Sequence, residues 1–453
     1  MYAVGIDIGT TTCSSVVLNL STRQAEYVCT IRNASELQGD VPGASLGDAG
    51  QIESLVSEQL GQIRSRLLGP IASIGLTGQM HGIVYIGRDG RAVSPLYTWQ
   101  DKRGEAFLDE GRSASVCLSN ASGYPMASGY GLVTHFMLER SGSLPADAAC
   151  LVTIADYIAM RLCDTPAPLI HASNAAGLGP FNLDVGAFDT KALKKAGIGT
   201  GLLPPVTRSA GVLGATRDGI PVSIAIGDNQ AGFLGSVRDQ DNSILLNIGT
   251  SGQISVTGNR LSGISEIQLR PLTDGKNLLV GATLCAGKAY ELVHRLIADC
   301  LRLAGAAPCD DLYDRMNRVA QQADEDPLKV RTTFSGTRQD PSLRGEVGNI
   351  SMDNLTAGSL VRGTIHGIVD ELSELYRLMQ PAIGPKRCLI GSGNAIRNNV
   401  ALASIAREAF GLPLLIPCHM EEAAFGAALF GAVSAGVLHS FEESRALIRY
   451  TNE

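Results

Sequence analysis

Apolar and polar positions alternate along the chain in two rhythms, one typical of helices and one typical of strands. Residues 51–68 repeat apolar side chains at helical spacing, and a Gly-Pro pair ends this predicted helix before a short buried strand at 71–76. In the second half, residues 360–379 keep helical spacing and lead into a short strand at 388–390. Strands and helices that alternate in this way predict an α/β fold.

One strand–turn–strand pattern occurs twice. An apolar strand, a Gly-Thr turn and a second apolar strand follow one another at 4–18 and again at 244–256. A polar segment at 238–242 precedes the second copy. We therefore expect two domains, residues 1–242 and 243–453, because the chain is longer than one core usually supports and each half begins with the same hairpin.

A Gly-Thr turn between strands offers the donors that a phosphate needs, backbone N–H groups and a hydroxyl. Only the first copy adds a carboxylate, Asp7, whereas the second has Asn247. One carboxylate is enough to anchor a Mg²⁺ ion that keeps most of its waters. A third turn, at 391–394, lies between a predicted strand and a predicted helix, where glycines let a nucleoside approach the backbone. Each turn alone is explained by an ordinary tight turn, but the repeat at corresponding positions predicts a nucleotide site.

Composition narrows the class of protein. The net charge of −7 argues against a general nucleic-acid binder, which needs a basic face to displace counterions. The ten cysteines show no paired CxxC spacing, which indicates small buried side chains in a reducing compartment. The start of the chain shows no export signal, and the uncharged run 423–438 is better explained as a buried helix than as a membrane span. We expect a cytoplasmic protein without nucleic-acid or membrane partners.

Further motifs make the pattern specific. They are Gly75-Leu-Thr-Gly-Gln-Met-His-Gly82, Leu96-Tyr-Thr-Trp-Gln-Asp-Lys-Arg103, Gly227-Asp-Asn-Gln230, Gly391-Ser-Gly-Asn394 and Glu421-Glu-Ala-Ala-Phe-Gly-Ala427. With the two hairpins, they make the chain resemble the FGGY family of carbohydrate kinases over nearly its whole length. The resemblance implies two duplicated actin- and hexokinase-like (ribonuclease H-like) ATPase domains around a central cleft. It also implies ATP and Mg²⁺ as cofactors and transfer of the γ-phosphoryl group to a sugar hydroxyl.

The resemblance also suggests which sugar is the acceptor. The motif at 96–101 and the motif Phe334-Ser-Gly-Thr-Arg-Gln-Asp-Pro341 are most similar to those of the members that phosphorylate sedoheptulose, and next to those that phosphorylate D-xylulose. The expected partner is therefore a small-molecule sugar. Other ketoses and polyols stay open, and a homodimer is what the family suggests.

Asp228 is the residue that the resemblance assigns as general base. It follows an apolar strand and begins a predicted helix, where a carboxylate can take the proton from the attacking sugar hydroxyl. An Asp at this position is often only a helix cap, and the two roles are compatible because the helix dipole keeps the carboxylate ionised. The expected sugar contacts are Gln79, Met80, His81, Trp99, Asp101, Asp228 and Asn229.

Some of these residues have an ordinary structural alternative. A lone histidine such as His81, or the only tryptophan, Trp99, would be a core residue by default. Asp101 could lie in a solvated turn, and Arg103 is explained equally well by a local ion pair with it.

The resemblance distributes the nucleotide over both halves. The phosphates are assigned to Thr10, Thr11, Thr12, Gly249 and Thr250, the adenosine to Gly391, Gly393 and Asn394, and Mg²⁺ to Asp7. The helix that begins at 421–424 is expected behind the adenine pocket.

Two departures from the family leave other functions open. Many relatives carry Lys or Arg near the position of Ser14 and a lysine near that of His135, and both cations are missing here. We expect this loss to alter phosphate affinity or rate. A sugar sensor without catalysis, an actin-like filament protein and an Hsp70-like chaperone are the alternatives, and the presence of Asp7 and Asp228 favours the kinase.

Overall fold

The computed structural model describes residues 1–39, 41–109, 111–259, 261, 264–307, 309–322, 328–340 and 342–451. The chain forms two compact units, which are described separately. The first unit comprises Met1–Gly235, Pro271–Gly275 and Glu421–Ile448. The second unit comprises Ser236–Arg270, Lys276–Met420 and Arg449–Glu453.

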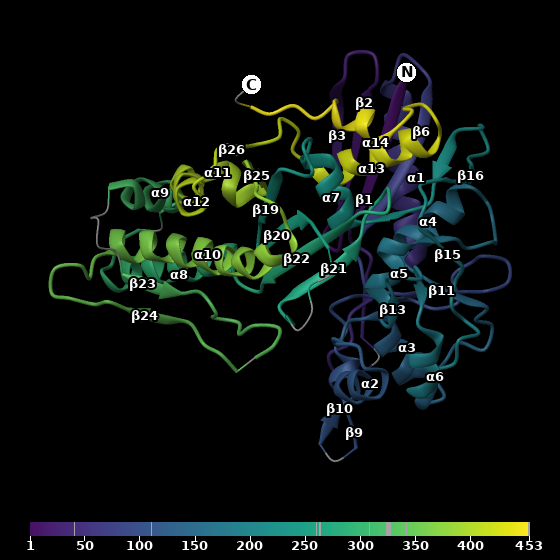
Figure 1. Cartoon of the computed structure of the whole chain (residues 1–453), viewed down its shortest axis with the longest axis horizontal. Coiled ribbons are helices and arrows are strands. Elements are labelled where there is room, and N and C mark those ends of the chain that lie inside the picture. Colours follow the sequence, from purple (N-terminus) through teal and green to yellow (C-terminus); the bar gives the residue numbers. More distant parts are fainter. Residues whose placement is uncertain are drawn as a thin grey trace. The chain divides into compact units, whose positions relative to one another are not determined.

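A central sheet organises the first unit (Figure 1). Its strands run in the order β16-β17-β6-β1-β2-β3, and β18 pairs with β6 beside this path. Their bounds are β1 (Tyr2–Ile8), β2 (Thr12–Asn19), β3 (Gln24–Arg32), β6 (Ile71–Gly78), β16 (Val212–Ala215), β17 (Pro221–Ser223) and β18 (Ile226–Gly227). The short strands of this unit are β4 (Glu36–Leu37), β5 (Leu46–Gly47), β7 (Val84–Ile86), β8 (Leu96–Tyr97), β9 (Phe107–Asp109), β10 (Arg112–Ser113), β11 (Cys150–Val152), β12 (Ile170–His171), β13 (Phe181–Asn182), β14 (Ala187–Phe188) and β15 (Val206–Thr207).

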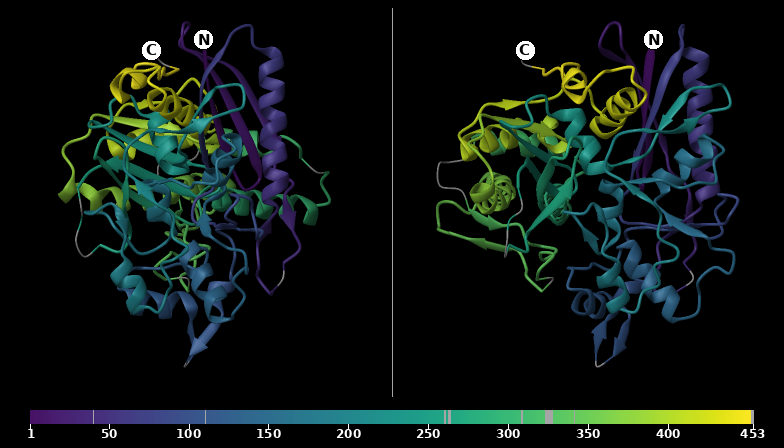
Figure 2. Two further views of the ribbon diagram at one scale, coloured as in Figure 1. Left: turned by 90° about the vertical axis from the view of Figure 1, so that its right-hand side faces the viewer. Right: turned by 45° about the vertical axis from the view of Figure 1, so that its right-hand side comes forward.

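Helices cover both faces of this sheet. The helices of the first unit, not all of which lie on this sheet, are α1 (Ala49–Arg66), α2 (Ala114–Ser122), α3 (Gly131–Arg140), α4 (Ile154–Leu162), α5 (Ala172–Leu178), α6 (Thr190–Lys195), α7 (Asp228–Ser236), α13 (Glu422–Ser434) and α14 (Phe441–Arg445), with a 3₁₀ turn at Arg103–Glu105. Figure 2 shows α13 on one face of β1 and β2 and α1 on the other. Because both faces are covered, the strands are apolar on both sides, and Val4, Ile6 and Ile8 of β1 are fully buried.

The second unit repeats this arrangement. Its sheet runs in the order β21-β22-β20-β19-β25-β26, with bounds β19 (Ser243–Ile248), β20 (Gly252–Thr257), β21 (Ile267–Pro271), β22 (Asn277–Thr283), β25 (Cys388–Ser392) and β26 (Leu414–Leu415). The other elements are β23 (Lys329–Arg331), β24 (Glu346–Gly348), α8 (Gly287–Leu303), α9 (Leu312–Gln322), α10 (Ala357–Met379), α11 (Asn394–Asn398), α12 (Val400–Phe410) and a 3₁₀ turn at Gln380–Ala382. Helix α10 packs on β20 and β22 beside α8, α9 and α12.

The two sheets show the duplication directly. In the first unit β1, β2 and β3 are antiparallel neighbours, and β6 lies parallel to β1. In the second unit β19, β20 and β22 are antiparallel neighbours, and β25 lies parallel to β19. The repeated hairpin is therefore the first hairpin of each sheet, and the predicted α/β duplication is confirmed.

Helix α13 belongs to the first unit, where it packs on β1 and β6. The expectation that it lies behind the adenine pocket stays a prediction. Glycines explain the packing on β1 and β6, because a Cβ at Gly5 would lie 1.8 Å from the carbonyl oxygen of Ala424, and one at Gly75 would lie 1.8 Å from that of Ala427. The helix is apolar all round and buried, so it has no polar face to indicate its partner. The predicted division at residue 242 does not include the return of Glu421–Ile448 to the first unit, and it stays a prediction.

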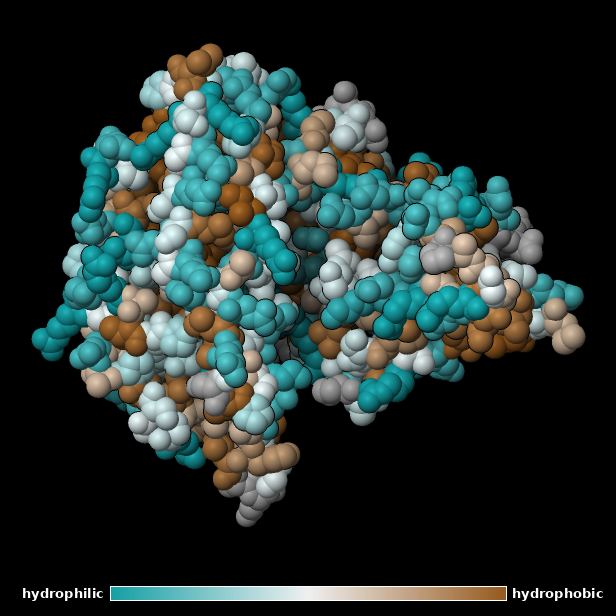
Figure 3. All heavy atoms as spheres, turned by 180° about the vertical axis from the view of Figure 1, so that it is seen from behind, coloured by the Kyte–Doolittle hydropathy of each residue, from teal (hydrophilic) through white to brown (hydrophobic). Residues whose placement is uncertain are grey.

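The surface is that of an ordinary globular protein. On the face shown in Figure 3, hydrophilic side chains dominate and hydrophobic ones are interspersed among them. Among the described residues, none of the helices has the length and apolar character needed to cross a bilayer.

Candidate active site

The turn of the first hairpin is held by its own backbone and by one asparagine. Gly9 donates its N–H to the carbonyl of Thr12 at 2.9 Å. Asn33 donates its side-chain amide to the carbonyl of Gly9 at 2.9 Å and its backbone N–H to that of Thr11 at 2.8 Å. Thr11 and Thr12 are exposed and Thr10 is half-buried. The turn is therefore a fixed loop with exposed threonines, as a phosphate site requires.

Thr10 connects two of the predicted motifs. The indole Nε1 of Trp99 donates to Thr10 Oγ1 at 2.9 Å, and Thr10 Oγ1 donates to Gln79 Oε1 at 3.5 Å. Trp99 is 46% exposed, so it is not the core residue that a lone tryptophan usually is, whereas Gln79 is 7% exposed. The first unit thus brings two predicted sugar residues and one predicted phosphate residue into a single hydrogen-bonded chain.

Asp7 lies in an acidic environment. It is paired across the strands with Ser14, and its pKa is raised from 3.8 to about 7 by burial, by Asp228 and by Glu421. The hydroxyl of Thr30 donates its one hydrogen to Glu421 Oε1 at 3.3 Å. In the 3.0 Å bond between Ser14 and Thr30, the Ser14 hydroxyl is therefore the donor. Position 14 of this chain is therefore a buried serine that a single hydroxyl, that of Thr30, connects to Glu421. Sequence reasoning assigned Glu421 no chemical role, because a Glu before an apolar helix is usually a simple dipole partner.

The donor set around Asp7 fits a hydrated divalent cation. Burial raises the pKa of Asp7 first, and the negative charges of Asp228 and Glu421 raise it further, so a cation nearby would favour the ionised form of Asp7; oxygen donors are the ligands that Mg²⁺ prefers. In the part of the chain that the structure describes, no three His, Cys, Asp or Glu side chains could hold a metal ion together. The arrangement therefore suits an ion that is bound through few protein oxygens and otherwise through water and phosphate.

Asp228 stands where a strand meets a helix. It follows Gly227, the last residue of β18, and is the first residue of α7. Its Oδ1 accepts the backbone N–H of Asn229 at 2.5 Å, and both side chains are half-buried. The carboxylate is therefore held at the start of the helix and is still accessible, and its capping and catalytic roles stay predictions. Asn229 follows in the same helical turn.

His81 is held in a strained backbone conformation. Its φ is +74°, a left-handed value that costs a non-glycine residue about 1–2 kcal/mol. Two contacts hold the ring there: Nδ1 donates to the carbonyl of Gly177 at 2.5 Å, and the ring stacks on Tyr130 with centroids 4.6 Å apart. Since Nδ1 carries the proton, Nε2 of the neutral ring is an acceptor for a hydroxyl. Strain of this kind gathers at ligand-binding sites.

Met80 packs inside the first unit. It is 4% exposed. A Cβ at Gly177 would lie 2.8 Å from the Cε of Met80, and a Cβ at Gly227 would lie 3.0 Å from its Sδ. The thioether therefore supports the loop that leads to Asp228. Its predicted contact with the carbon chain of a sugar stays a prediction.

Asp101 forms a buried ion pair. It has no exposed surface, and its carboxylate accepts Arg103 Nε at 2.8 Å, Arg103 Nη2 at 3.1 Å and the backbone N–H of Ser45 at 3.1 Å. This geometry favours the local ion pair over direct contact of Asp101 with a sugar. By fixing the turn that follows Trp99, the pair holds that indole in place.

His135 is a core residue. It is 1% exposed, its Nδ1 lies 2.7 Å from the hydroxyl of Tyr85, and burial lowers its pKa below the usual value. The position therefore serves packing in this chain.

The second unit gathers the remaining residues that are predicted to bind the nucleotide. Gly249 donates its N–H to the carbonyl of Ser251 at 3.0 Å, which closes the second turn as Gly9 closes the first. Gly393 has φ +87°, and a Cβ there would lie 2.6 Å from the carbonyl oxygen of Ile248. The 391–394 turn therefore lies directly against Ile248, the last residue of β19.

The start of α8 approaches the same turn. Gly287 donates its N–H to the carbonyl of Gly249 at 2.9 Å, and Lys288 donates its N–H to that of Thr250 at 3.1 Å. Sequence reasoning missed Gly287, because one glycine at a helix start gives no signal of what approaches it. In the second unit Gly249, Thr250, Gly391, Gly393 and Asn394 thus share one region.

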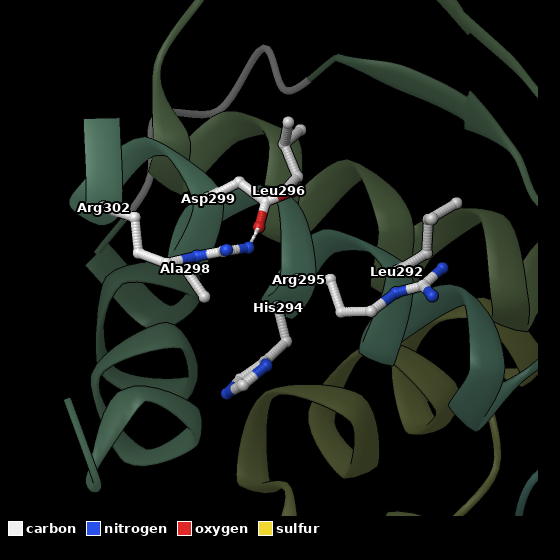
Figure 4. A pocket seen from close by; sticks show the side chains of 7 residues that line it. All are labelled: Leu292, His294, Arg295, Leu296, Ala298, Asp299 and Arg302. Atoms are coloured by element: carbon white, nitrogen blue, oxygen red, sulfur yellow. Dashed lines mark hydrogen bonds and ion pairs between the residues drawn. The ribbon is translucent and has the colours of Figure 1, made fainter. Parts of the chain in front are cut away.

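A separate pocket lies along the outer part of α8. It measures about 470 Å³ and is lined by Leu292, His294, Arg295, Leu296, Ala298, Asp299 and Arg302 (Figure 4). His294 stacks on Tyr313 with centroids 4.1 Å apart. No residue predicted for sugar or nucleotide lines this pocket, so it is not the predicted site.

The fold is shared with solved structures of sugar and glycerol kinases. The structure superimposes on the crystal structure of ligand-bound xylulose kinase from Lactobacillus acidophilus with a TM-score of 0.86, at 18% identity over 99% of this chain and 92% of that chain. It superimposes on Plasmodium falciparum glycerol kinase with ADP with a TM-score of 0.82, at 15% identity over 98% and 92%. These likenesses confirm the predicted two-domain actin- and hexokinase-like fold.

The sequence places the chain in one family of such kinases. Residues 2–235 match the N-terminal domain, and residues 245–435 match the C-terminal domain, of the FGGY family of carbohydrate kinases. The chain therefore belongs to the FGGY family of carbohydrate kinases. It is 29% identical to the sedoheptulokinase of Mus musculus over 94% of this chain and 96% of that protein. It is an ATP-dependent sugar kinase, as the sequence motifs predicted.

Proposed function

We propose that this kinase phosphorylates sedoheptulose to sedoheptulose 7-phosphate, with Asp228 as general base. The observation that carries the acceptor is the near full-length similarity to a sedoheptulokinase. The motif Leu96–Asp101 supports a sugar site beside the phosphate turn, because the indole of Trp99 donates a hydrogen bond to Thr10 of that turn. Pro341, the last residue of the second acceptor motif, lies outside the described residues.

In this proposal Asp228 takes the proton of the attacking sugar hydroxyl. The hydroxyl oxygen forms a bond to the γ-phosphorus while the bond from phosphorus to the β,γ-bridging oxygen breaks and ADP leaves. Asp228 suits the task because it is half-buried and anchored at the start of α7. His81 and Asn229 orient the acceptor, and the indole face of Trp99 packs against its C–H groups.

The phosphates bind at Thr10, Thr11, Thr12, Gly249 and Thr250, and the adenosine binds at Gly391, Gly393 and Asn394. Asp7 would hold a Mg²⁺ ion, which would supply charge neutralisation on the phosphate oxygens. The raised pKa of Asp7, caused first by burial and then by the charges of Asp228 and Glu421, supports this role, because a cation would offset the disfavoured negative charge.

The acceptor is tested by sugar-dependent ADP release with Mg·ATP. Sedoheptulose, D-xylulose, D-ribulose and glycerol are compared by kcat/KM, and the phosphorylated carbon is assigned by NMR. The proposal predicts the highest kcat/KM for sedoheptulose and phosphate on carbon 7. A higher value for D-xylulose would replace the acceptor and keep the class of enzyme, and turnover of none of them despite ATP binding would favour the sugar sensor. A cytoplasmic location and a homodimer stay predictions.

A further inference from the structure

The backbone just before Asp228 has little sheet to support it. Strand β18 has only two residues, Ile226 and Gly227, which pair with β6. Side chains from β6 and α5 supply the missing support, and the three that do so, Thr77, Ser173 and Asn174, are all buried. We call these three residues the latch.

Two hydroxyls hold the two residues nearest to Asp228. Thr77 Oγ1 donates to the carbonyl of Ile226 at 2.7 Å. Ser173 Oγ accepts the N–H of Gly227 at 2.9 Å. Because Gly227 precedes Asp228 directly, both bonds act within two residues of the proposed base.

The third latch residue reaches one step further back. Asn174 Nδ2 lies 3.4 Å from the carbonyl oxygen of Ala225, to which it donates. The same amide faces the carboxylate of Asp156 at 3.3 and 3.4 Å, and Thr153 donates to that carboxylate at 2.6 Å. Asp156 is 2% exposed and thus fixes the orientation of the Asn174 amide from behind.

Ser173 is itself oriented by His171. The Nδ1 of His171 accepts the backbone N–H of Ser173 at 3.2 Å, so this nitrogen carries no proton. The Ser173 hydroxyl, 2.8 Å away, therefore donates its hydrogen to Nδ1. The Nε2 proton then points to the carbonyl of Arg208 at 3.3 Å. Each hydrogen of this chain has a defined place, so Ser173 Oγ is directed as an acceptor toward Gly227.

We propose that the latch residues Thr77, Ser173 and Asn174 are positioning residues for phosphoryl transfer, which hold the backbone that carries Asp228. The inference rests on the proposed role of Asp228. A general base must lie within hydrogen-bond reach of the proton that it takes, and a displacement of about 1 Å can lower the rate about 100-fold. The latch fixes three successive residues, Ala225 to Gly227, and so sets where the Asp228 carboxylate begins.

The sharpest test uses two substitutions at one position. Thr77→Val keeps the shape and removes the hydroxyl, whereas Thr77→Ser keeps the hydroxyl and loses a methyl group. We expect Thr77→Val to lower kcat about 10- to 100-fold with KM for the sugar changed less than about 3-fold. We expect Thr77→Ser to keep kcat close to that of the unchanged chain. Ser173→Ala should resemble Thr77→Val.

Matched controls separate positioning from general stability. Thr364→Val removes a buried hydroxyl that donates to the carbonyl of Leu360 at 2.8 Å, and Ser122→Ala removes one that donates to that of Leu118 at 2.7 Å. Both lie outside the latch, and their kcat should be unchanged. Unchanged kcat in Thr77→Val and Ser173→Ala, or an equal loss in the two controls at equal loss of Tm, would overturn the inference.

Combination with Asp228→Asn tells the two proposals apart. If Asp228 is the base and the latch acts through it, adding Thr77→Val to Asp228→Asn should lower the residual rate less than 2-fold, because the effects are not additive. If adding Thr77→Val lowered the residual rate of Asp228→Asn as much as it lowers the rate of the unchanged chain, the positioning role of the latch would be overturned and the role of Asp228 would stand. Full turnover of Asp228→Asn by itself would overturn the role of Asp228, whatever the latch variants do.

Discussion

At the scale of single residues, the acidic cluster of Asp7, Asp228 and Glu421 is the most unusual feature of the site. A carboxylate whose pKa stands near 7 is held in an environment that disfavours its charge. Such an arrangement lowers stability in the absence of a cation and is retained where it serves binding.

Asp7→Asn should make the protein more stable and less active. A raised pKa means that the folded state favours the protonated acid, so the stability contribution of Asp7 is complete below pH 3.8 and is lost as the pH rises through about 7. At pH 8 without Mg²⁺, the asparagine should raise the free energy of unfolding of the first unit by about 1–3 kcal/mol, after allowance for partial exposure. Urea unfolding at pH 8 and pH 5 measures this, and the gain should be smaller at pH 5. A loss of stability at pH 8 would contradict the account.

Ser14→Lys should strengthen ATP binding. The new ammonium group would lie across the strands from Asp7, lower the pKa of Asp7 and offer a positive charge beside the phosphate turn. KM for ATP at saturating sugar should fall about 3- to 10-fold, which corresponds to about 1 kcal/mol. Ser14→Met provides the control for length without charge. If both variants change KM for ATP equally, the positive charge is not the cause, and the prediction is contradicted.

Residues also show where sequence reasoning ends. Asp7, Asp228 and Trp99 were predicted because they stand inside motifs, and the structure connects Asp7 with Asp228 and Trp99 with Thr10. Glu421 and the latch residues were missed, because a glutamate, a threonine or a serine in a buried segment has no spacing that reveals its partner. Asp101 shows the reverse, since its carboxylate is already occupied by Arg103.

At the scale of elements, backbone contact explains why α13 belongs to the first unit. Gly5 and Gly75 are register partners on β1 and β6, and together they offer a surface without side chains. The small residues of α13 then bring its backbone against the strands. Periodicity predicted the helices near 51–68 and 360–379 because each has one apolar face. It could not place α13, which is apolar on every side.

Gly75→Ala should destabilise the first unit strongly. The new Cβ would lie 1.8 Å from the carbonyl oxygen of Ala427, and a backbone atom cannot move aside as a flexible side chain does. We expect a loss above about 3 kcal/mol, measured by thermal or urea unfolding. Gly61→Ala is the control, because a Cβ at Gly61 of α1 meets nothing within 4 Å, and this change should stabilise the helix by about 1 kcal/mol. Equal effects of the two changes would contradict the packing argument.

At the scale of the whole molecule, the two units share one pattern of strand pairing but carry different predicted site residues. In the first unit its hairpin carries Asp7 and its neighbour β6 leads to the His81 loop, whereas in the second unit the equivalent hairpin meets the 391–394 turn. The repeated hairpin was enough to predict this duplication, since the same local pattern specifies the same strand pairs. The return of residues 421–448 to the first unit was not predictable, because it depends on contacts between segments far apart in the sequence.

The central claim, that Asp228 is the base of a sugar kinase, is tested most directly by the turnover of Asp228→Asn. We would measure kcat with saturating Mg·ATP and sedoheptulose, together with the Kd for ATP of the same preparation. The account predicts a 10²- to 10⁴-fold loss of kcat, the range of a general base, with the Kd for ATP nearly unchanged. Full turnover of a folded Asp228→Asn variant would contradict it.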